Sequence, residues 1–155
     1  MKLSDIMVCD AVVPELKAES RDDAIVELVN ALAAAGAIPK NSTSRISKAV
    51  LARETKATTG IGKGVALPHA KCKGVRKPIG TIGVSQKGID FSALDSKPVH
   101  SVILLVSSPD GADEHLEAME TIFNHIQKSI FRKFLLQSTT VEAIAGLIEE
   151  AEDLV

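Results

Sequence analysis

Apolar residues recur along the chain at helical or strand spacing, and the first clear helix lies in the N-terminal third. Its apolar residues follow at i, i+3, i+4 and i+7, the spacing of one helix face. They are Ile25, Leu28, Val29 and Leu32. Ser20 with Asp23 resembles a capping box before that face, and Gly36 is a natural stop after it. The preceding segment, Ala11 to Leu16, is a possible first strand, which Pro14 would confine to a sheet edge.

A second helix is predicted after Asn41 or Ser42, because either residue is a good N-cap. Its apolar face comprises Ile46, Ala49 and Val50. Arg53 extends this stripe by two helical turns. A guanidinium at the end of a buried stripe either snorkels to solvent or points into a site, so Arg53 is a candidate site residue.

Two more helices are predicted in the C-terminal third. The turn signal Pro109-Asp110-Gly111 precedes a long helix that should begin near Asp113. Its predicted core stripe is Leu116, Met119, Phe123, Ile126 and Ile130. On the same helical wheel His125 falls on the opposite face, where solvent is expected. Thr139 with Glu142 resembles a second capping box, and the apolar face of the last helix comprises Val141, Ile144, Ala145 and Ile148.

The middle of the chain is rich in predicted strands. Pro78 to Val84 and Val99 to Val106 have strand composition, and the second is almost continuously apolar, which is typical of a central strand. Between them, Gly88 to Phe91 is a turn or a short edge segment. Helices on either side of such a middle predict an α/β layered architecture. With no internal repeat or linker, residues 1–155 are expected to form one domain.

Composition narrows the class of protein. The chain has 155 residues, 45% hydrophobic and 25% charged, which is typical of a soluble globular domain with a sizeable core. It contains four Phe and no Trp or Tyr, and its formal net charge is −2. Stacking platforms and long basic blocks are therefore missing, so we expect no nucleic-acid partner.

Segments for export or membrane insertion are not evident in the sequence. No apolar region follows the N-terminal Lys2, and no run approaches the ~18 apolar residues that a membrane span needs. Cys9 and Cys72 lie far apart and have no metal-ligand spacing, although sequence leaves a disulfide between them open. We predict free thiols in a reducing cytoplasm, and no membrane insertion.

The segment from Thr58 to His69 is the strongest chemical signal. Gly60, Gly62 and Gly64 occupy alternate positions, and a short apolar run then ends in Pro68-His69. Glycines of this kind can adopt positive φ and expose N–H groups, as an anion-binding concavity requires. Neutral imidazole is a competent nucleophile near pH 7. We therefore predict that the loop holds His69 for phosphoryl transfer, in which positioning and charge neutralisation dominate.

Other chemistries fit this loop less well. Lys63 follows Gly62, but the spacing is not that of a P-loop, and GxGxG is not the dinucleotide fingerprint. No histidine pair has HExxH spacing, so neither a metal nor another cofactor is expected. Ser107 and Ser108 lack the nucleophile-elbow context and are expected to be turn residues.

His115 is the second candidate site histidine. It lies in the first turn of the long predicted helix, at the edge of the predicted apolar stripe. A helix-edge histidine without function and a phosphate-stabilising histidine at a helix N-terminus both fit this position. His100, which opens the predicted central strand, is expected to be structural.

The ordered motif that includes Arg53-Glu54 and the loop from Thr59 to His69 resembles the active-site signature of a known family. It is similar to the enzyme IIA domains of the fructose–mannitol class in the bacterial phosphoenolpyruvate-dependent phosphotransferase system, which include the nitrogen-regulatory IIA proteins. Ile89 to Val99 resembles the family segment before its central strand, and Glu114-His115-Leu116 resembles its second-histidine motif. The resemblance extends from about Leu3 to Leu147.

The resemblance implies a three-layer α/β/α domain with a central mixed β-sheet flanked by helices. It implies that His69 accepts a phosphoryl group from an HPr-type carrier and that His115 helps to place or stabilise that group. Arg53 would pair with phosphate oxygens, and Thr59 would lie at the rim of the loop. Val106 to Pro109 is more polar here than is usual in the family.

Three functions fit these residues. A nitrogen-type regulator would bind targets according to its phosphorylation state, and the free-standing length favours this reading. A fructose- or mannitol-type permease component would instead pass the phosphoryl group to a IIB domain. An interaction module that has lost the chemistry is disfavoured, because His69, His115 and Arg53 are all present. Each is a carrier or binding protein rather than an independent turnover enzyme, and the sequence specifies neither sugar, target nor oligomeric state.

Overall fold

A mixed sheet lies at the centre of the computed structural model, which describes residues 1–154; Val155, the last residue of the predicted domain, lies outside them. Its five strands are β1 (Gly60–Gly62), β2 (Val65–Ala66), β3 (His69–Lys71), β4 (Ile79–Ile89) and β5 (Val99–Ser107). β5 is central, as predicted: it pairs with β4 in antiparallel and with both β2 and β3 in parallel orientation.

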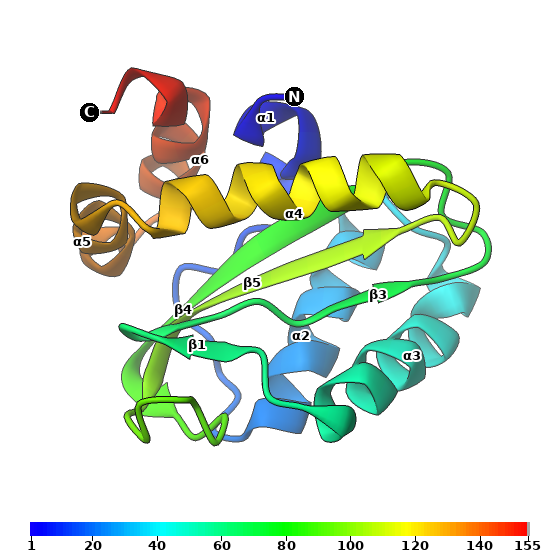
Figure 1. The fold of residues 1–155 in the computed structure, drawn as a ribbon, viewed down its shortest axis with the longest axis horizontal. Coiled ribbons are helices and arrows are strands. Elements are labelled where there is room, and N and C mark those ends of the chain that lie inside the picture. The colour runs from blue at the N-terminus through cyan, green and yellow to red at the C-terminus, as the bar shows by residue number, and fades with distance from the viewer. Residues whose placement is uncertain (155) are drawn as a thin grey trace.

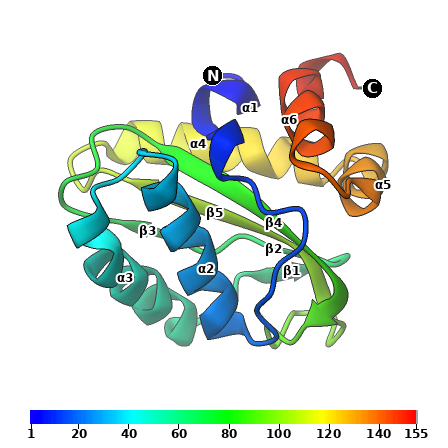
Figure 2. The same ribbon diagram turned by 180° about the vertical axis from the view of Figure 1, so that it is seen from behind.

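Helices cover both faces of this sheet (Figures 1 and 2). One face is covered by α2 (Arg21–Ala34) and α3 (Thr43–Lys56). The other is covered by α1 (Leu3–Ile6), α4 (Ala112–Ile126), α5 (Ser129–Gln137) and α6 (Val141–Glu149). Short 3-10 turns lie at Cys9–Ala11, Lys40–Ser42 and Ala151–Asp153. The prediction of an α/β/α domain around a mixed sheet is confirmed.

The side chains of β5 alternate between the two cores. Val102, Leu104 and Val106 pack toward α2 and α3, whereas Ile103 and Leu105 pack toward α4 and its neighbours. All five are buried. This burial on both faces explains why the strand is apolar at nearly every position.

The N-terminal predictions are confirmed for the helices and partly for the strand. The Ser20 hydroxyl accepts a hydrogen bond from the Asp23 amide and caps α2, and Gly36 ends the helix with φ 78°. Ala11 to Leu16 does not form a regular strand. It contributes a single bridge between Val13 and Gly83 along the edge of β4, and Pro14 has no amide to extend the ladder.

The prediction for the buried face of α4 is only partly confirmed: Ile126 is buried and Met119 packs against the core, but the rest of the predicted stripe is exposed. Leu116 is 59% exposed and Phe123 is 40% exposed. The residues of α4 that are buried are Ala118, Ile122, His125 and Ile126. Ile130 belongs to a separate helix, α5, which the sequence did not predict. The helix carries two apolar stripes, and periodicity alone does not show which one meets the core.

The last helix begins one residue later than predicted. The hydroxyl of Thr140, and not that of Thr139, accepts from the amide of Ala143 at 3.1 Å and caps α6. Across residues 1–154 we find no helix with both the length and the apolar character needed to cross a bilayer.

His125 is buried, contrary to the prediction of a solvated face, and links the two ends of the chain to α4. Its Nε2 lies 3.4 Å from Glu152 Oε1, which also accepts a hydrogen bond from the Leu3 amide at 2.7 Å. Its Nδ1 has no hydrogen-bond partner among the described residues. Burial lowers the pKa of His125, although Glu152 opposes this shift.

We predict that His125 makes the fold less stable as the pH falls below about 6.5. The unfolded chain binds a proton there more readily than the buried imidazole does, so stability is present above that pH and is lost below it. Urea unfolding at about pH 7, 6 and 5 should show a smaller loss of stability for His125→Leu than for the wild type. Asn124→Leu, which adds leucine to the same helix without removing a titratable group, should keep the wild-type slope.

Candidate functional site

His69 is the first residue of β3, and its ring is held by its own loop. Its Nδ1 lies 2.7 Å from the carbonyl oxygen of Leu67. A carbonyl oxygen can only accept a hydrogen bond, so Nδ1 carries the proton. The lone pair of neutral His69 is therefore on Nε2. The side chain is half-buried, which leaves it accessible to a reactant.

His115, in the first turns of α4, faces His69 across the end of the sheet. The two ring centroids are 5.8 Å apart, and the ring planes are inclined by 45°. The Nδ1 atom of His115 is in hydrogen-bond contact with the Ser107 hydroxyl. Two imidazoles at this separation leave room for a small group between or beside them.

The parallel pairing of β3 with β5 brings these residues together. In this register His69 is opposite Leu105 and Lys71 is opposite Ser107. The carboxyl ends of both strands therefore lie at one edge of the sheet, where ligand sites of α/β proteins form. A turn closed by the Gly111 amide on the Ser108 carbonyl then starts α4, which carries His115 back over that edge.

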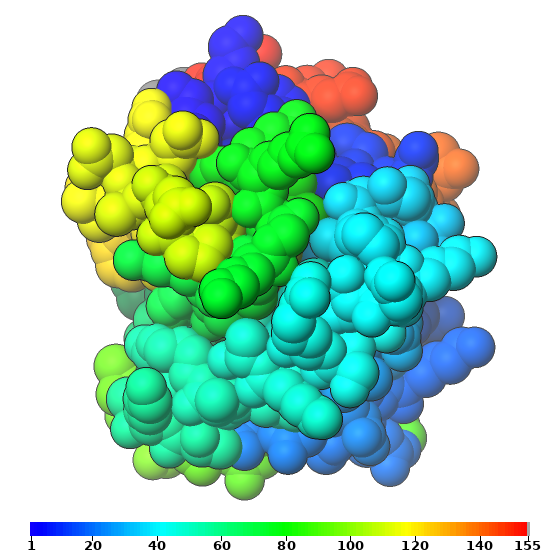
Figure 3. Space-filling model, turned by 90° about the vertical axis from the view of Figure 1, so that its right-hand side faces the viewer, coloured from blue at the N-terminus to red at the C-terminus, as the bar shows by residue number. Residues whose placement is uncertain are grey.

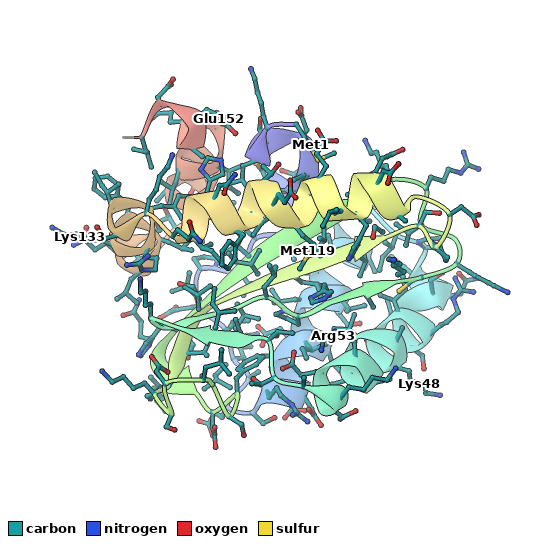
Figure 4. The ribbon with its side chains drawn as sticks, in the orientation of Figure 1. Met1, Lys48, Arg53, Met119, Lys133 and Glu152 are labelled. Atoms are coloured by element: carbon teal, nitrogen blue, oxygen red, sulfur yellow. The ribbon has the colours of Figure 1, made fainter. Side chains whose placement is uncertain are left out.

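Arg53 approaches the same place from the last turn of α3. Figure 4 shows it on the α3 side of the sheet, while Met119 extends from α4 on the other side. Its Nη1 donates to the Ala57 carbonyl at 2.9 Å, which holds the side chain at the end of the helix. Its charge is close enough to His69 to contribute to lowering the pKa of that imidazole. The structure thus brings His69, His115 and Arg53 together.

Glu54 and Thr59 form a buried, doubly hydrogen-bonded pair next to the site. The carboxylate of Glu54 accepts from the Thr59 amide at 2.7 Å and from the Thr59 hydroxyl at 2.5 Å. Both residues are buried. The resemblance implied that Thr59 lies at the rim of the loop, but the residue is buried instead. Its hydroxyl is committed to Glu54, and the pair ties the end of α3 to the strand segment before His69.

The glycines of the loop are mostly distant from His69, which corrects their predicted role. Gly62 and Gly64, with φ 96° and 77°, form the hairpin turn between β1 and β2. Val65 is opposite Ser101 and His69 is opposite Leu105. At ~3.3 Å per residue this places the turn about 13 Å along the sheet from His69. We therefore no longer assign these two glycines to phosphate binding.

Gly60 is required for packing rather than for an exposed amide. A Cβ atom at this position would lie 2.8 Å from the Cβ of Ala93. The N–H group of Gly60 is not available to a ligand, because it already donates to the Thr58 hydroxyl at 3.0 Å. The alternating glycines thus shape a hairpin beside the site instead of cradling an anion.

The surroundings of both site histidines favour the neutral imidazole, because they lower the pKa of each. Burial is the main cause that lowers the pKa of His69, with a smaller contribution from Arg53. Burial is also the main cause that lowers the pKa of His115, and the positive charges of His69, when protonated, and of Lys71 lower it further. Neutral imidazole retains the lone pair that a nucleophile needs.

The segment of the chain that contains Arg53 and His69 is rich in basic residues. The segment from Lys40 to Lys77 carries more than half of the lysines and arginines of the chain, and Glu54, which is buried, is its one acid. Figure 3 shows that α3, the loop after β3 and the start of α4 share one face of the molecule. The start of α4 brings Asp113 and Glu114 to this face, so the basic residues of the α3 side are the ones that favour an anionic reactant.

Ser107 is the site residue that sequence reasoning missed. It was expected to be a turn residue, but it ends β5, is buried, and contacts His115. A polar residue at the carboxyl end of a central strand is a usual position for a site residue, and this was the available signal. His100 is structural, as expected, with Nδ1 2.8 Å from the Ser85 carbonyl.

Metal ligation finds no support in the described part of the chain. No group of three or more His, Cys, Asp or Glu side chains that could hold a metal ion occurs there. Cys9 and Cys72 are free thiols, as predicted.

Sequence comparison connects this chain to a known family. Residues 5–151 match the family model described as "Phosphoenolpyruvate-dependent sugar phosphotransferase system, EIIA 2". The nitrogen regulatory protein of Bradyrhizobium diazoefficiens is 30% identical, over 96% of this chain and 95% of its own length. The fructose-specific EIIABC component of Bacillus subtilis is also 30% identical, over 97% of this chain, but the chain spans 23% of that relative.

Solved structures share the fold. The nitrogen regulatory protein IIA-Ntr from Neisseria meningitidis superposes with a TM-score of 0.83 at 23% identity, over 94% of this chain and 98% of that one. The IIA mannitol protein of Escherichia coli, in its complex with phosphorylated IIB mannitol, has a TM-score of 0.75 at 17% identity, over 93% and 99% of the two chains.

We predict that Thr59→Val destabilises the protein by about 1–3 kcal/mol, because it leaves one oxygen of a buried carboxylate without its donor. Thr59→Ser keeps the hydroxyl and should cost less than about 1 kcal/mol. The free energies of unfolding from urea titrations test both. Equal stabilities for wild type and Thr59→Val would contradict a stabilising role of the hydrogen bond from Thr59 to Glu54.

Proposed function

Because the chain belongs to the EIIA type-2 family of the phosphoenolpyruvate-dependent sugar phosphotransferase system, we propose that it carries a phosphoryl group on His69. The observation that supports this most is the hydrogen bond from Nδ1 of His69 to the Leu67 carbonyl. It leaves Nε2 as a nucleophile beside a second imidazole, a guanidinium and a basic segment of the chain.

In the proposed step Nε2 of His69 attacks the phosphorus of a phosphohistidine on an HPr-type carrier. The new N–P bond forms as the N–P bond of the donor breaks, and the electron pair of that bond stays with the donor nitrogen. The proton on Nδ1 remains on His69, and this N–H continues to donate its hydrogen bond to the Leu67 carbonyl. A protonated ring is a good leaving group, so the phosphoryl group stays available for onward transfer.

The surrounding charges stabilise the transferred group. Phosphoryl transfer places negative charge on three equatorial oxygens, and positioned cations neutralise it. Arg53 supplies a guanidinium suited to two phosphate oxygens. Lys71 follows His69 on β3 and lies close enough to affect the pKa of His115. His115, whose pKa is lowered by burial, is the second proposed donor to the phosphoryl oxygens.

The exposed apolar stripe of α4 is the proposed docking surface for the carrier. Leu116 and Phe123 lie on the flank of α4 next to His115 and Met119 by the 100° helical wheel. Both are exposed, and Phe134 of the adjoining α5 is exposed as well. Apolar side chains that stand clear of the core beside a reactive residue are typical of a partner interface.

For the onward step we favour a regulator that binds target proteins according to its phosphorylation state. The named nitrogen regulatory protein, similar over nearly its whole length, supports this choice. Transfer to a IIB domain is the second candidate, supported by the IIA–IIB complex among the structural neighbours and by the EIIABC relative. Free thiols at Cys9 and Cys72 support a cytoplasmic site of action.

Incubation with phosphoenolpyruvate, enzyme I and an HPr-type carrier is expected to add one acid-labile phosphoryl group, detected by intact mass. His69→Ala should gain none, because the acceptor nitrogen is gone. His100→Gln, which replaces a structural histidine of the same sheet, should be phosphorylated like the wild type. If the wild-type protein gains no phosphoryl group, the carrier function fails and an interaction module without the chemistry becomes the favoured function.

Phe123→Asp is expected to slow phosphoryl transfer from the HPr-type carrier by about ten-fold or more, because it places a charge in the apolar interface. Quench-flow measurement of phosphorylated protein gives the rate. Val26→Asp, at an equally exposed position on the opposite helical layer, should leave the rate unchanged. The docking assignment fails if both variants transfer at the same rate.

A further inference from the structure

The two site histidines differ in the chemistry of the atom that holds Nδ1. For His69 this atom is the Leu67 carbonyl oxygen, which has no proton to donate. For His115 it is the Ser107 hydroxyl, which can donate as well as accept. Neutral imidazole has one N–H, so the partner of Nδ1 decides which nitrogen carries it.

The surroundings of Ser107 determine the direction of its hydrogen bond. The residue is 1% exposed, so its hydroxyl proton cannot reach bulk water. Within residues 1–154 this hydroxyl has the ring of His115 as its hydrogen-bond partner. If His115 donated to the oxygen, the hydroxyl proton would stay buried without an acceptor, which is costly. Donation from Ser107 to Nδ1 satisfies both groups.

We infer that Ser107 is a positioning residue that holds neutral His115 in the Nε2–H tautomer. His69 is held in the opposite tautomer, with its proton on Nδ1 and its lone pair on Nε2. One imidazole is thereby set up as the nucleophile and its neighbour as a hydrogen-bond donor. This inference rests on the proposed phosphorylation of His69 for its consequence, but the tautomer itself does not depend on it.

The consequence concerns the phosphoryl group after transfer. A lone pair on Nε2 of His115 would repel the phosphoryl oxygens, whereas an N–H there stabilises them. A buried hydroxyl in contact with the ring also fixes the ring orientation, as partners of metal-bound histidines do in other proteins. Ser107 would thus act on the phosphohistidine through His115 without touching the phosphoryl group.

The first test uses the unphosphorylated full chain. Long-range 1H–15N correlation spectra, recorded at a pH where His115 is neutral, report which ring nitrogen bears the proton. Wild-type His115 should show the Nε2–H pattern, and Ser107→Ala should shift it toward a mixture of tautomers. Ser101→Ala, a buried serine of the same strand, should leave the pattern unchanged. A wild-type spectrum with the proton on Nδ1 of His115 would overturn the inference.

The second test measures the half-life of the phosphohistidine. Ser107→Ala should shorten it about ten-fold, the effect of one hydrogen bond to a charged group, and Ser107→Thr, which keeps the hydroxyl, should restore it. His115→Gln supplies an amide donor that needs no help from Ser107. In that background Ser107→Ala should therefore change the half-life less than two-fold.

The outcomes separate this inference from the proposed function. If no phosphoryl group is gained by wild-type protein, the proposed function fails while the tautomer result stands. If phosphorylation succeeds but Ser107→Ala alters neither the spectrum nor the half-life, Ser107 has no positioning role. An equal effect of Ser107→Ala in the wild-type and His115→Gln backgrounds would likewise overturn it, because the serine would then act by another route.

Discussion

The parallel pairing of β3 with β5 is the constraint on which the site depends. It places His69 opposite Leu105, and so brings the loop that holds the imidazole to the edge where β5 ends and the chain turns into α4. Ser107 and Lys71 lie on these two strands themselves, and the remaining site residues reach this edge from helices packed on them. Arg53 comes from α3 on one face, and His115 comes from α4 on the other. Burial of β5 on both faces stabilises this register, because a slip by one residue would exchange the two cores.

Local sequence signals predicted those elements of the fold whose limits and burial depend on residues close together in the chain. Ser20 caps α2, Gly36 ends it, and the apolar run from Val99 to Val106 is the central strand, each for a reason visible within a few residues. The meeting of Arg53, His69 and His115 followed from the ordered motif that resembles a family signature. Nothing local in the chain would have placed residues so far apart in one site.

What sequence did not predict depends on relations between distant segments. The helix α4 has two apolar stripes, and the one that meets the core is set by packing against α1 and α5. His125 lies on this stripe, against Phe131 of α5 and Glu152. Gly62 and Gly64 have the positive φ that was expected, but β2 ends before β3 begins, and this separates their turn from His69. Ser107 was hidden because its role depends on the strand register and on a helix that starts later in the chain.

The link from Leu3 through Glu152 to His125 has a further meaning for how such a domain is used. It anchors the first and last helical turns to the same side of α4, and Figure 1 shows both ends of the chain emerging together above that helix. The edge of the sheet that carries His69 and Ser107 is left clear of both ends. A neighbouring polypeptide joined before or after this unit would therefore not obstruct the histidines. Two relatives differ in this respect, since the similar segment makes up 95% of the nitrogen regulatory protein but 23% of the EIIABC component.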